Sequence, residues 1–237
     1  MYTWVHTWWG RDKAHLGYGA SLEASDMRGR WHRHRQPEGE DRDRFFLRTL
    51  QQIGQSGETF MLRLEDDVVV NRFLRHNVST WKVLQDPAFG IGFLSTCERV
   101  QGLVKCKPTA DPNTMSFRAH GYHFGGGYIV RMSAIMRNLH RISEILTYIK
   151  KLNGRFGPTT AIADAIVDDG RWNMYVHVPS LVKVDVSQPS HQLGNVSKRY
   201  GEQPYSEQFR RSDAILRQGI RKHAHEGHSV SLTQNRS

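Results

Sequence analysis

The stretch that decides the fold is Phe60-Met61-Leu62-Arg63-Leu64-Glu65-Asp66-Asp67-Val68, a hydrophobic run that leads into three consecutive carboxylates. The run from Thr59 to Leu64 predicts a buried strand. Adjacent like charges repel one another and fit badly in a packed strand, so the trio should lie where the strand ends. Ligands of open α/β sheets bind outside the carboxyl ends of strands, and carboxylate oxygens suit Mg²⁺ or Mn²⁺. The stretch therefore predicts either a metal site or a solvated acidic turn at a sheet edge.

Strand-like and helix-like segments alternate on both sides of this stretch. The predicted helices are 43–53, 71–84, 133–151 and a short one that Thr159 caps and that ends near Gly170. The other predicted strands are 2–8, 31–35, 89–95, 122–130 and 174–178, and 105–116 reads as a loop. This alternation predicts an α/β sheet covered on both faces, in one domain that spans residues 1–205. Residues 206–237 predict a basic, His-rich tail that is partly disordered.

Composition excludes several classes of protein. The chain has 237 residues, with 33 Lys+Arg against 23 Asp+Glu and a formal net charge of +10. An aromatic content of 10% does not fit a wholly disordered chain. No apolar run approaches the ~20 residues of a membrane span, and the start lacks a secretory signal, so we expect a cytoplasmic protein, in the host cytoplasm if it is viral. Cys97 and Cys106 are too few for a disulfide scaffold or a zinc cluster; they could pair with each other, but free thiols are expected in a cytosolic protein.

The order of several motifs gives the chain a family resemblance. Leu64-Glu65-Asp66-Asp67-Val68 resembles the DxD-type motif of GT-A-fold glycosyltransferases, in the LEDD form of the lipopolysaccharide and collagen glycosyltransferase group and of some N-acetylglucosaminyltransferases. Later segments resemble further motifs of these families in the same order. Residues 89–95 resemble their aromatic strand, and 125–134 resemble their glycine-rich step from strand to helix. Residues 161–166 resemble their acidic helix, and 175–182 resemble their PSLV strand. The resemblance covers roughly residues 42 to 195. It implies a Rossmann-like mixed sheet and a hexosyltransferase-like enzyme.

The resemblance also implies a donor site. The donor would be a nucleotide-sugar, in this family a UDP-sugar, with Mn²⁺ or Mg²⁺ held against its diphosphate by Asp67 and Asp66. Glu65 and the backbone of Gly125, Gly126 and Gly127 would contact the donor, although glycines there also suit a bulge or tight turn. The family often places a histidine soon after PSLV as a further metal ligand. Here His191 is the candidate for that place, with Asp185 as the alternative.

An inverting transfer needs a general base that deprotonates the acceptor hydroxyl. Asp164 matches the family's acidic helix position and is the expected base, with Asp168 and Asp169 as alternatives. A solvated helix residue is the structural alternative for Asp164. A retaining transfer would not need this base.

Charge and aromatic residues bear on the acceptor. Arginine outnumbers lysine by 24 to 9, and arginine forks suit phosphates, although a basic solvated surface gives the same count. Trp8, Trp9, Trp31 and Phe124 would either stack on bases and sugars or pack in the core. We therefore expect DNA carrying hydroxymethylated pyrimidines as acceptor, as for phage enzymes of DNA modification. The alternatives are a saccharide acceptor such as lipopolysaccharide, or a nucleic-acid-binding protein without catalysis.

Overall fold

The computed structural model describes residues 1–7, 21–65, 68–95, 105–121, 126–151 and 157–184, and all that follows refers to these residues. The strands are β1 (Tyr2–Thr7), β2 (His32–Arg35), β3 (Phe60–Leu64), β4 (Val68–Val70), β5 (Phe89–Phe93), β6 (Lys107–Pro108), β7 (Thr114–Phe117), β8 (Gly127–Arg131), β9 (Asn173–His177) and β10 (Val182–Val184). The helices are α2 (Arg42–Gln55), α3 (Leu74–Ser79), α5 (Met132–Lys151), α6 (Pro158–Asp169) and the 3₁₀ helix η2 (Lys82–Gln85). The predicted tail, 206–237, and the predicted domain end at residue 205 lie outside this part of the chain.

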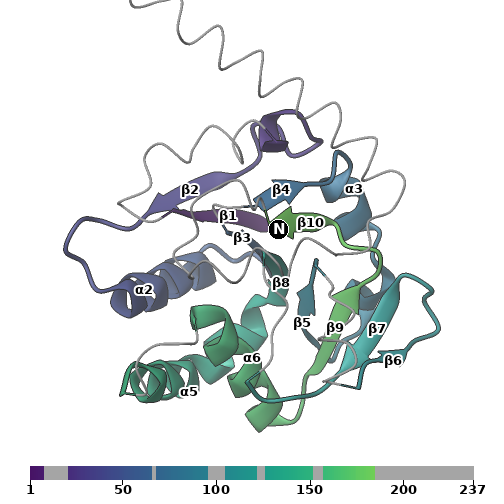
Figure 1. Cartoon of the computed structure of the whole chain (residues 1–237). Coiled ribbons are helices and arrows are strands. Elements are labelled where there is room, and N and C mark those ends of the chain that lie inside the picture. The colour runs from purple at the N-terminus through teal and green to yellow at the C-terminus, as the bar shows by residue number, and fades with distance from the viewer. Residues whose placement is uncertain (8–20, 66–67, 96–104, 122–125, 152–156, 185–237) are drawn as a thin grey trace, which may run out of the picture.

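The centre of the fold is an eight-stranded mixed sheet with the order β2-β1-β3-β8-β5-β9-β7-β6 (Figure 1). Strands β2, β1 and β3 run parallel to one another, and so do β5 and β9. Strand β8 is antiparallel to both β3 and β5, which makes β3 and β5 parallel to each other across it. The carboxyl ends of β1, β2, β3, β5 and β9 therefore lie along one edge of the sheet.

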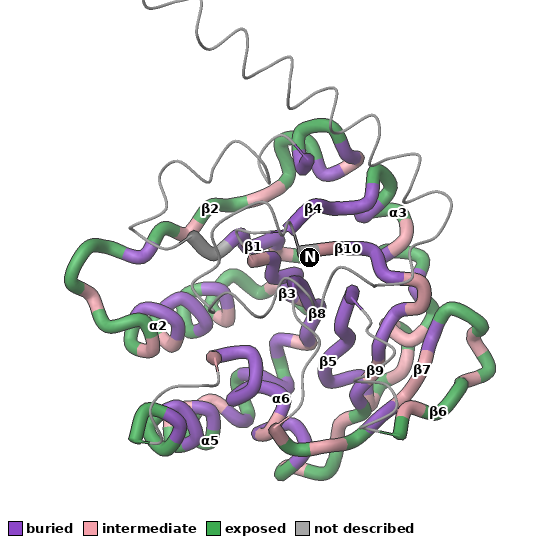
Figure 2. The backbone as a smooth tube through the Cα atoms, in the orientation of Figure 1, coloured by how far each residue is buried: buried purple, intermediate pink, exposed green. Residues whose placement is uncertain are grey.

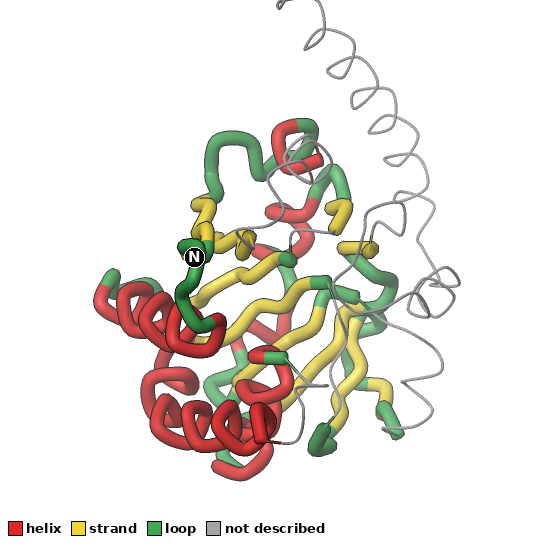
Figure 3. Tube along the Cα trace, turned by 60° about the vertical axis from the view of Figure 1, so that its left-hand side comes forward, coloured by secondary structure: helices red, strands yellow, loops and turns green. Residues whose placement is uncertain are grey.

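Each face of the sheet has its own hydrophobic core. One face is covered by α2, α5 and α6, the long helices gathered on one side of the sheet in Figure 3, and its core contains Trp4, Phe46 and Phe93. The other face carries α3, η2 and the two-stranded sheet of β4 and β10, around a core that includes Trp81 and Phe89. The central strands are buried along their length (Figure 2). The prediction of a single-domain α/β fold with a mixed sheet covered on both faces is confirmed.

Three sequence-based predictions of elements are wrong. The helix expected over 71–84 is interrupted, because Trp81 has an extended backbone and its buried indole nitrogen donates to Thr114 Oγ1 at 2.7 Å. The loop expected over 105–116 contains β6 and the start of β7, since pairing with β9 makes a strand of a polar sequence. Thr159 does not cap α6: Gly157 occupies the cap position, Pro158 opens the helix, and the Thr159 hydroxyl turns to Arg63.

Packing around Trp81 gives a stability prediction. A Cβ atom added to Gly92 would lie 2.5 Å from an atom of the Trp81 ring, and this ring is held in place by its hydrogen bond to β7. We expect Gly92→Ala to destabilise the fold by about 1–3 kcal/mol through overpacking, measured by chemical denaturation. Gly157→Ser is the matched control, because no heavy atom lies within 4 Å of the added Cβ and serine is a good helix cap. Equal losses in the two variants would contradict this reading.

Candidate functional site

The acidic stretch begins at the carboxyl edge of the sheet, next to a switch in strand order. Leu22 and Met27, in the described part of the chain between β1 and β2, pack on one face of the sheet, and α2, between β2 and β3, covers the other. Strands β2 and β3 flank β1 on opposite sides, so the strand order reverses at β1. Open α/β sheets bind ligands where the strand order switches in this way, outside the carboxyl ends. Glu65 follows the carboxyl end of β3 directly.

Glu65 is joined to the glycine-rich segment that precedes β8. Its backbone N–H donates to the Gly126 carbonyl oxygen at 3.1 Å. The Gly126 N–H in turn donates to Glu65 Oε2 at 3.3 Å. Two of the predicted donor-binding positions, 61 residues apart in the chain, therefore meet at one edge of the sheet.

The glycines here have structural reasons of their own. Gly126 has a φ of +91°, a backbone conformation that glycine adopts far more readily than other residues. A Cβ at Gly127 would lie 2.9 Å from Leu64 Cδ2, because β8 and β3 approach closely at this register. The tight turn and close strand approach explain both residues without a ligand. Gly125 lies outside the described residues.

The other predicted metal ligands, Asp66, Asp67 and His191, lie outside the described residues, and so does Asp185. The structure does describe two residues next to them in sequence, Val68 and Val184. In the pair formed by β4 and β10, Val184 stands opposite Val68. Val68 directly follows Asp67 in the chain and Val184 directly precedes Asp185. In the described part of the chain, His, Cys, Asp and Glu side chains form no group of three that could hold a metal. The carboxylate donors of the trio fit a hard cation such as Mg²⁺ or Mn²⁺, because these cations prefer oxygen ligands.

Asp164 lies on α6 and contacts the segment that precedes the glycines. Its Oδ1 accepts from the Gly121 N–H at 2.7 Å and is 3.9 Å from His120 Nδ1. Thr159, five residues earlier on α6, contacts Arg63 of β3. Five residues turn a helix by about 140°, so Asp164 faces a different side of α6 from the one that meets β3. The structure thus places Asp164 and Glu65 at opposite ends of the 121–126 connection, without bringing their carboxylates together.

The alternative bases are held by ion pairs and hydrogen bonds. Asp168 accepts from Arg141 at 2.7 Å. Asp169 accepts from Asn138 and Trp172; burial acts to raise its pKa, but these hydrogen bonds, with nearby arginines, leave the pKa below its ordinary value. Both residues serve the contact between α5 and α6.

Arg63 is a residue at this site whose role the sequence did not reveal. Its side chain is buried in β3, reaches Thr159 and lies 3.8 Å from Glu65 Oε1. One feature of the sequence could have pointed to it: a single arginine lies between two apolar residues, Leu62 and Leu64, in a strand expected to be buried on both faces. Such a charge requires partners, because an unpaired buried ion is costly.

The remaining residues singled out in the sequence lie partly against the core and partly outside the described residues. Trp31 packs against the core and donates to Glu23, whereas Trp8, Trp9 and Phe124 lie outside the described residues. Cys106 is a free thiol, and burial raises its pKa to about 11, which makes it a poor nucleophile. Cys97 is outside the described residues. None of the described helices is long and apolar enough to cross a membrane.

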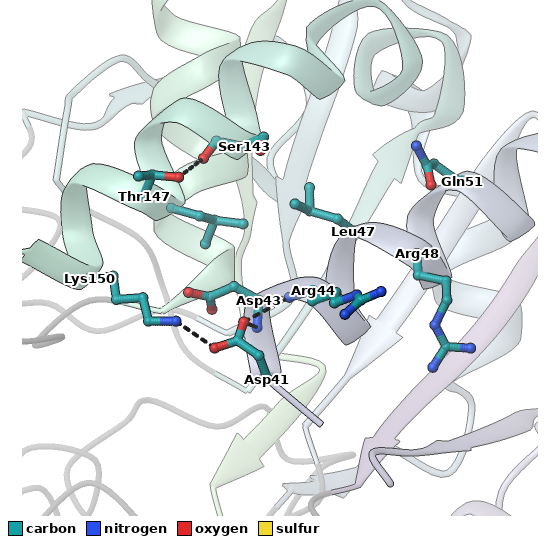
Figure 4. A pocket seen from close by; sticks show the side chains of 10 residues that line it. Asp41, Asp43, Arg44, Leu47, Arg48, Gln51, Ser143, Thr147 and Lys150 are labelled. Atoms are coloured by element: carbon teal, nitrogen blue, oxygen red, sulfur yellow. Dashed lines mark hydrogen bonds and ion pairs between the residues drawn. The ribbon is translucent and has the colours of Figure 1, made fainter. Parts of the chain in front are cut away.

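A groove of about 540 Å³ lies between α2 and α5 (Figure 4). Leu47 and Leu146 form its apolar part, and Lys150 reaches across to Asp41 at 2.6 Å. Both ends of this ion pair are exposed, and the lining carries charges of both signs. None of the predicted site residues lines it. We therefore assign the candidate site to the end of β3, where the topology and the Glu65–Gly126 contacts coincide.

His177, at the carboxyl end of β9, gives the fold a pH dependence. Burial lowers its pKa from the usual 6.5, and its Nδ1 donates to the Pro179 carbonyl oxygen at 2.8 Å. The unfolded chain therefore binds the proton more readily than the folded one, so stability falls as pH drops through about 6.5 toward the folded-state pKa. We expect the thermal midpoint of the wild type to fall between about pH 7 and pH 5.

His177→Asn should flatten this profile, because asparagine can donate in the same place without titrating. His34, whose pKa burial also lowers, accounts for a residual slope. His140→Asn is the control, since that side chain is 91% exposed. An unchanged slope in His177→Asn would contradict the assignment.

Comparison with known proteins yields structural likenesses only. No family model and no curated protein sequence matches the chain. It is similar to galactosyltransferase LgtC, solved in complex with donor and acceptor sugar analogues, at 11% identity and a TM-score of 0.42 over 70% of each chain. It is also similar to A197 from STIV, at 11% identity and a TM-score of 0.43, over 77% of this chain and 84% of that one. At this level neither likeness identifies an activity, and the fold class rests on the strand order and layers.

Proposed function

We propose that the chain is a metal-dependent glycosyltransferase of the GT-A type that moves a sugar from a nucleotide-sugar, a UDP-sugar by the motif resemblance, to a hydroxyl group. The observation that carries the proposal is the position of Glu65. The acidic trio starts at the switch in strand order, and Glu65 is hydrogen-bonded to the glycine-rich segment. The Glu65–Gly126 pair continues the β3–β8 ladder by one position, which holds the start of the trio at this edge of the sheet.

In this proposal, different residues bind the metal and the donor. Asp67 and Asp66 hold Mn²⁺ or Mg²⁺, with Asp185 or His191 as a further ligand; the register of β4 and β10 favours Asp185, the residue that follows Val184. A cation held there would supply positive charge against the leaving diphosphate. Glu65 and the backbone of Gly125, Gly126 and Gly127 line the donor side.

Asp164 is the proposed base for an inverting transfer. Its Oδ1 accepts from the Gly121 N–H at 2.7 Å, which places the carboxylate beside the segment that precedes the glycines. Apo contacts of this kind often rearrange when substrate binds.

The proposed acceptor is DNA with hydroxymethylated pyrimidines, because the net charge favours a polyanion. Residues 185–237 hold eight basic and five acidic residues, so seven of the ten net charges lie in residues 1–184. The basic excess thus belongs mainly to the part of the chain that carries the candidate site. A saccharide acceptor is the competing outcome.

The test is thermal stabilisation of the wild type across a nucleotide-sugar panel with and without Mn²⁺, followed by transfer assays. We expect one UDP-sugar with Mn²⁺ to raise the melting temperature, and chelation by EDTA to abolish the shift. That donor is then offered with hydroxymethylated DNA, unmodified DNA and lipopolysaccharide. Transfer to the first alone supports the DNA acceptor, and transfer to lipopolysaccharide replaces it. Absence of a shift and of UDP release with every donor refutes the transferase.

A further inference from the structure

Arg63 is a buried cation inside a ring of aromatic side chains. Its side chain is 6% exposed. The guanidinium carbon lies 5.3 Å from the ring centre of Trp4, 5.5 Å from that of Phe46 and 5.6 Å from that of Tyr128. Burial raises the pKa of Tyr128 to about 12, so its hydroxyl stays neutral and gives Arg63 no counter-charge. Aromatic faces attract a cation, but a buried charge also needs an anion.

Glu65 provides this anion. Glu65 Oε1 is 3.8 Å from Arg63 Nη1, and Arg63 Nη1 also donates to Thr159 Oγ1 at 3.1 Å. Arg63 thus joins three pieces of the fold: the body of β3, the first turn of α6 and the first carboxylate of the acidic trio.

The second oxygen of Glu65 is occupied as well. Glu65 Oε2 accepts from the Gly126 N–H at 3.3 Å, and the Glu65 N–H donates to the Gly126 carbonyl at 3.1 Å. One oxygen therefore faces the buried cation and the other faces the glycine segment. Contacts on both sides favour one orientation of the carboxylate, although 36% of the side chain is exposed.

We propose that Arg63 and Glu65 are positioning residues, and that they lock the end of β3 to the glycine segment while leaving Asp66 and Asp67 to bind the cation. The part that concerns the cation rests on the proposed function; the lock itself does not. It gives Glu65 a positioning role in addition to its proposed place beside the donor, and it explains why a strand of the buried sheet carries an arginine.

The lock makes a directional prediction about stability. Glu65→Gln keeps an oxygen for Gly126 but removes the negative charge that lies 3.8 Å from the buried Arg63 guanidinium. Arg63→Met removes the need for that charge. We expect Glu65→Gln to reduce the unfolding free energy clearly in the wild type and very little in the Arg63→Met background, a coupling of roughly tenfold in the unfolding equilibrium constant.

The cycle is measured by urea denaturation without metal. Arg63→Lys serves as a second background in case Arg63→Met folds poorly: it keeps a buried charge, so Glu65→Gln should remain costly there. If Glu65→Gln costs the same in the wild-type and Arg63→Met backgrounds, the lock is refuted.

Calorimetric titration with Mn²⁺ and UDP tests the division of roles. We expect Glu65→Gln to weaken Mn²⁺ binding by less than about tenfold, whereas Asp67→Asn removes it. Equal loss in both variants makes Glu65 a ligand and overturns the division. If the wild type binds no Mn²⁺, the proposed function and the roles of Asp66 and Asp67 fail together, while the stability cycle still decides the lock.

Discussion

Asp67→Asn is expected to reduce sugar transfer by ~100-fold or more and to abolish Mn²⁺-dependent stabilisation by the donor. Asparagine has nearly the shape of aspartate but lacks its charge, so it binds a divalent cation far more weakly. Charge stabilisation by a metal contributes several kcal/mol to the transition state, and each 1.36 kcal/mol changes the rate about tenfold. The measurements are UDP release at saturating donor and the melting temperature with and without Mn²⁺.

The matched control is Asp43→Asn in the first turn of α2. Asp43 pairs with its neighbour Arg42 on a different element from the candidate site. It should leave transfer and the metal-dependent shift unchanged and lower stability by no more than about 1 kcal/mol. An active Asp67→Asn that still responds to Mn²⁺ would show that the acidic trio is a structural turn.

Phe46→Ala is expected to destabilise the fold by about 3–5 kcal/mol, the largest single effect on stability we predict. The Phe46 side chain is fully buried, stacks on Trp4 at 5.6 Å between ring centres and lies under the Arg63 guanidinium. Alanine removes the ring from both partners at once, so the loss combines a cavity with a weakened environment for a buried cation.

Phe73→Ala is the control, because Phe73 is 46% exposed and precedes the short helix α3. Its loss should stay below about 1 kcal/mol. Both are measured as midpoints and slopes of urea denaturation. A Phe46→Ala variant as stable as Phe73→Ala would contradict the packing of α2 on the sheet.

The long elements could be predicted from sequence because their patterns are local. The helix expected over 43–53 is α2, bounded by a side-chain cap at Asp41, and the helix expected over 133–151 is α5. The buried run before the acidic trio is β3. The helix expected over 71–84 was wrong because Trp81 is fixed by a residue of β7, 33 positions away, and no local pattern contains that contact.

The candidate site was predictable in its chemistry and only partly in its geometry. Strand, trio and glycines were predicted from their sequence, and the structure joins Glu65 to Gly126. The structure also shows that Asp164 lies on a different side of α6 from Thr159, the residue that contacts β3, so its carboxylate does not meet that of Glu65. The spacing of acidic residues along the sequence does not predict this.

The sequence by itself determined the class of fold, the place of the acidic trio after a buried strand and the excess of positive charge, because these depend on residue type and short-range spacing. Tertiary structure decided the strand order, the pairing of β4 with β10 next to the trio in sequence, and the placement of Arg63 among three aromatic rings. These features join residues from distant parts of the chain, and their free energy comes from burial and pairing that exist only once the sheet has formed.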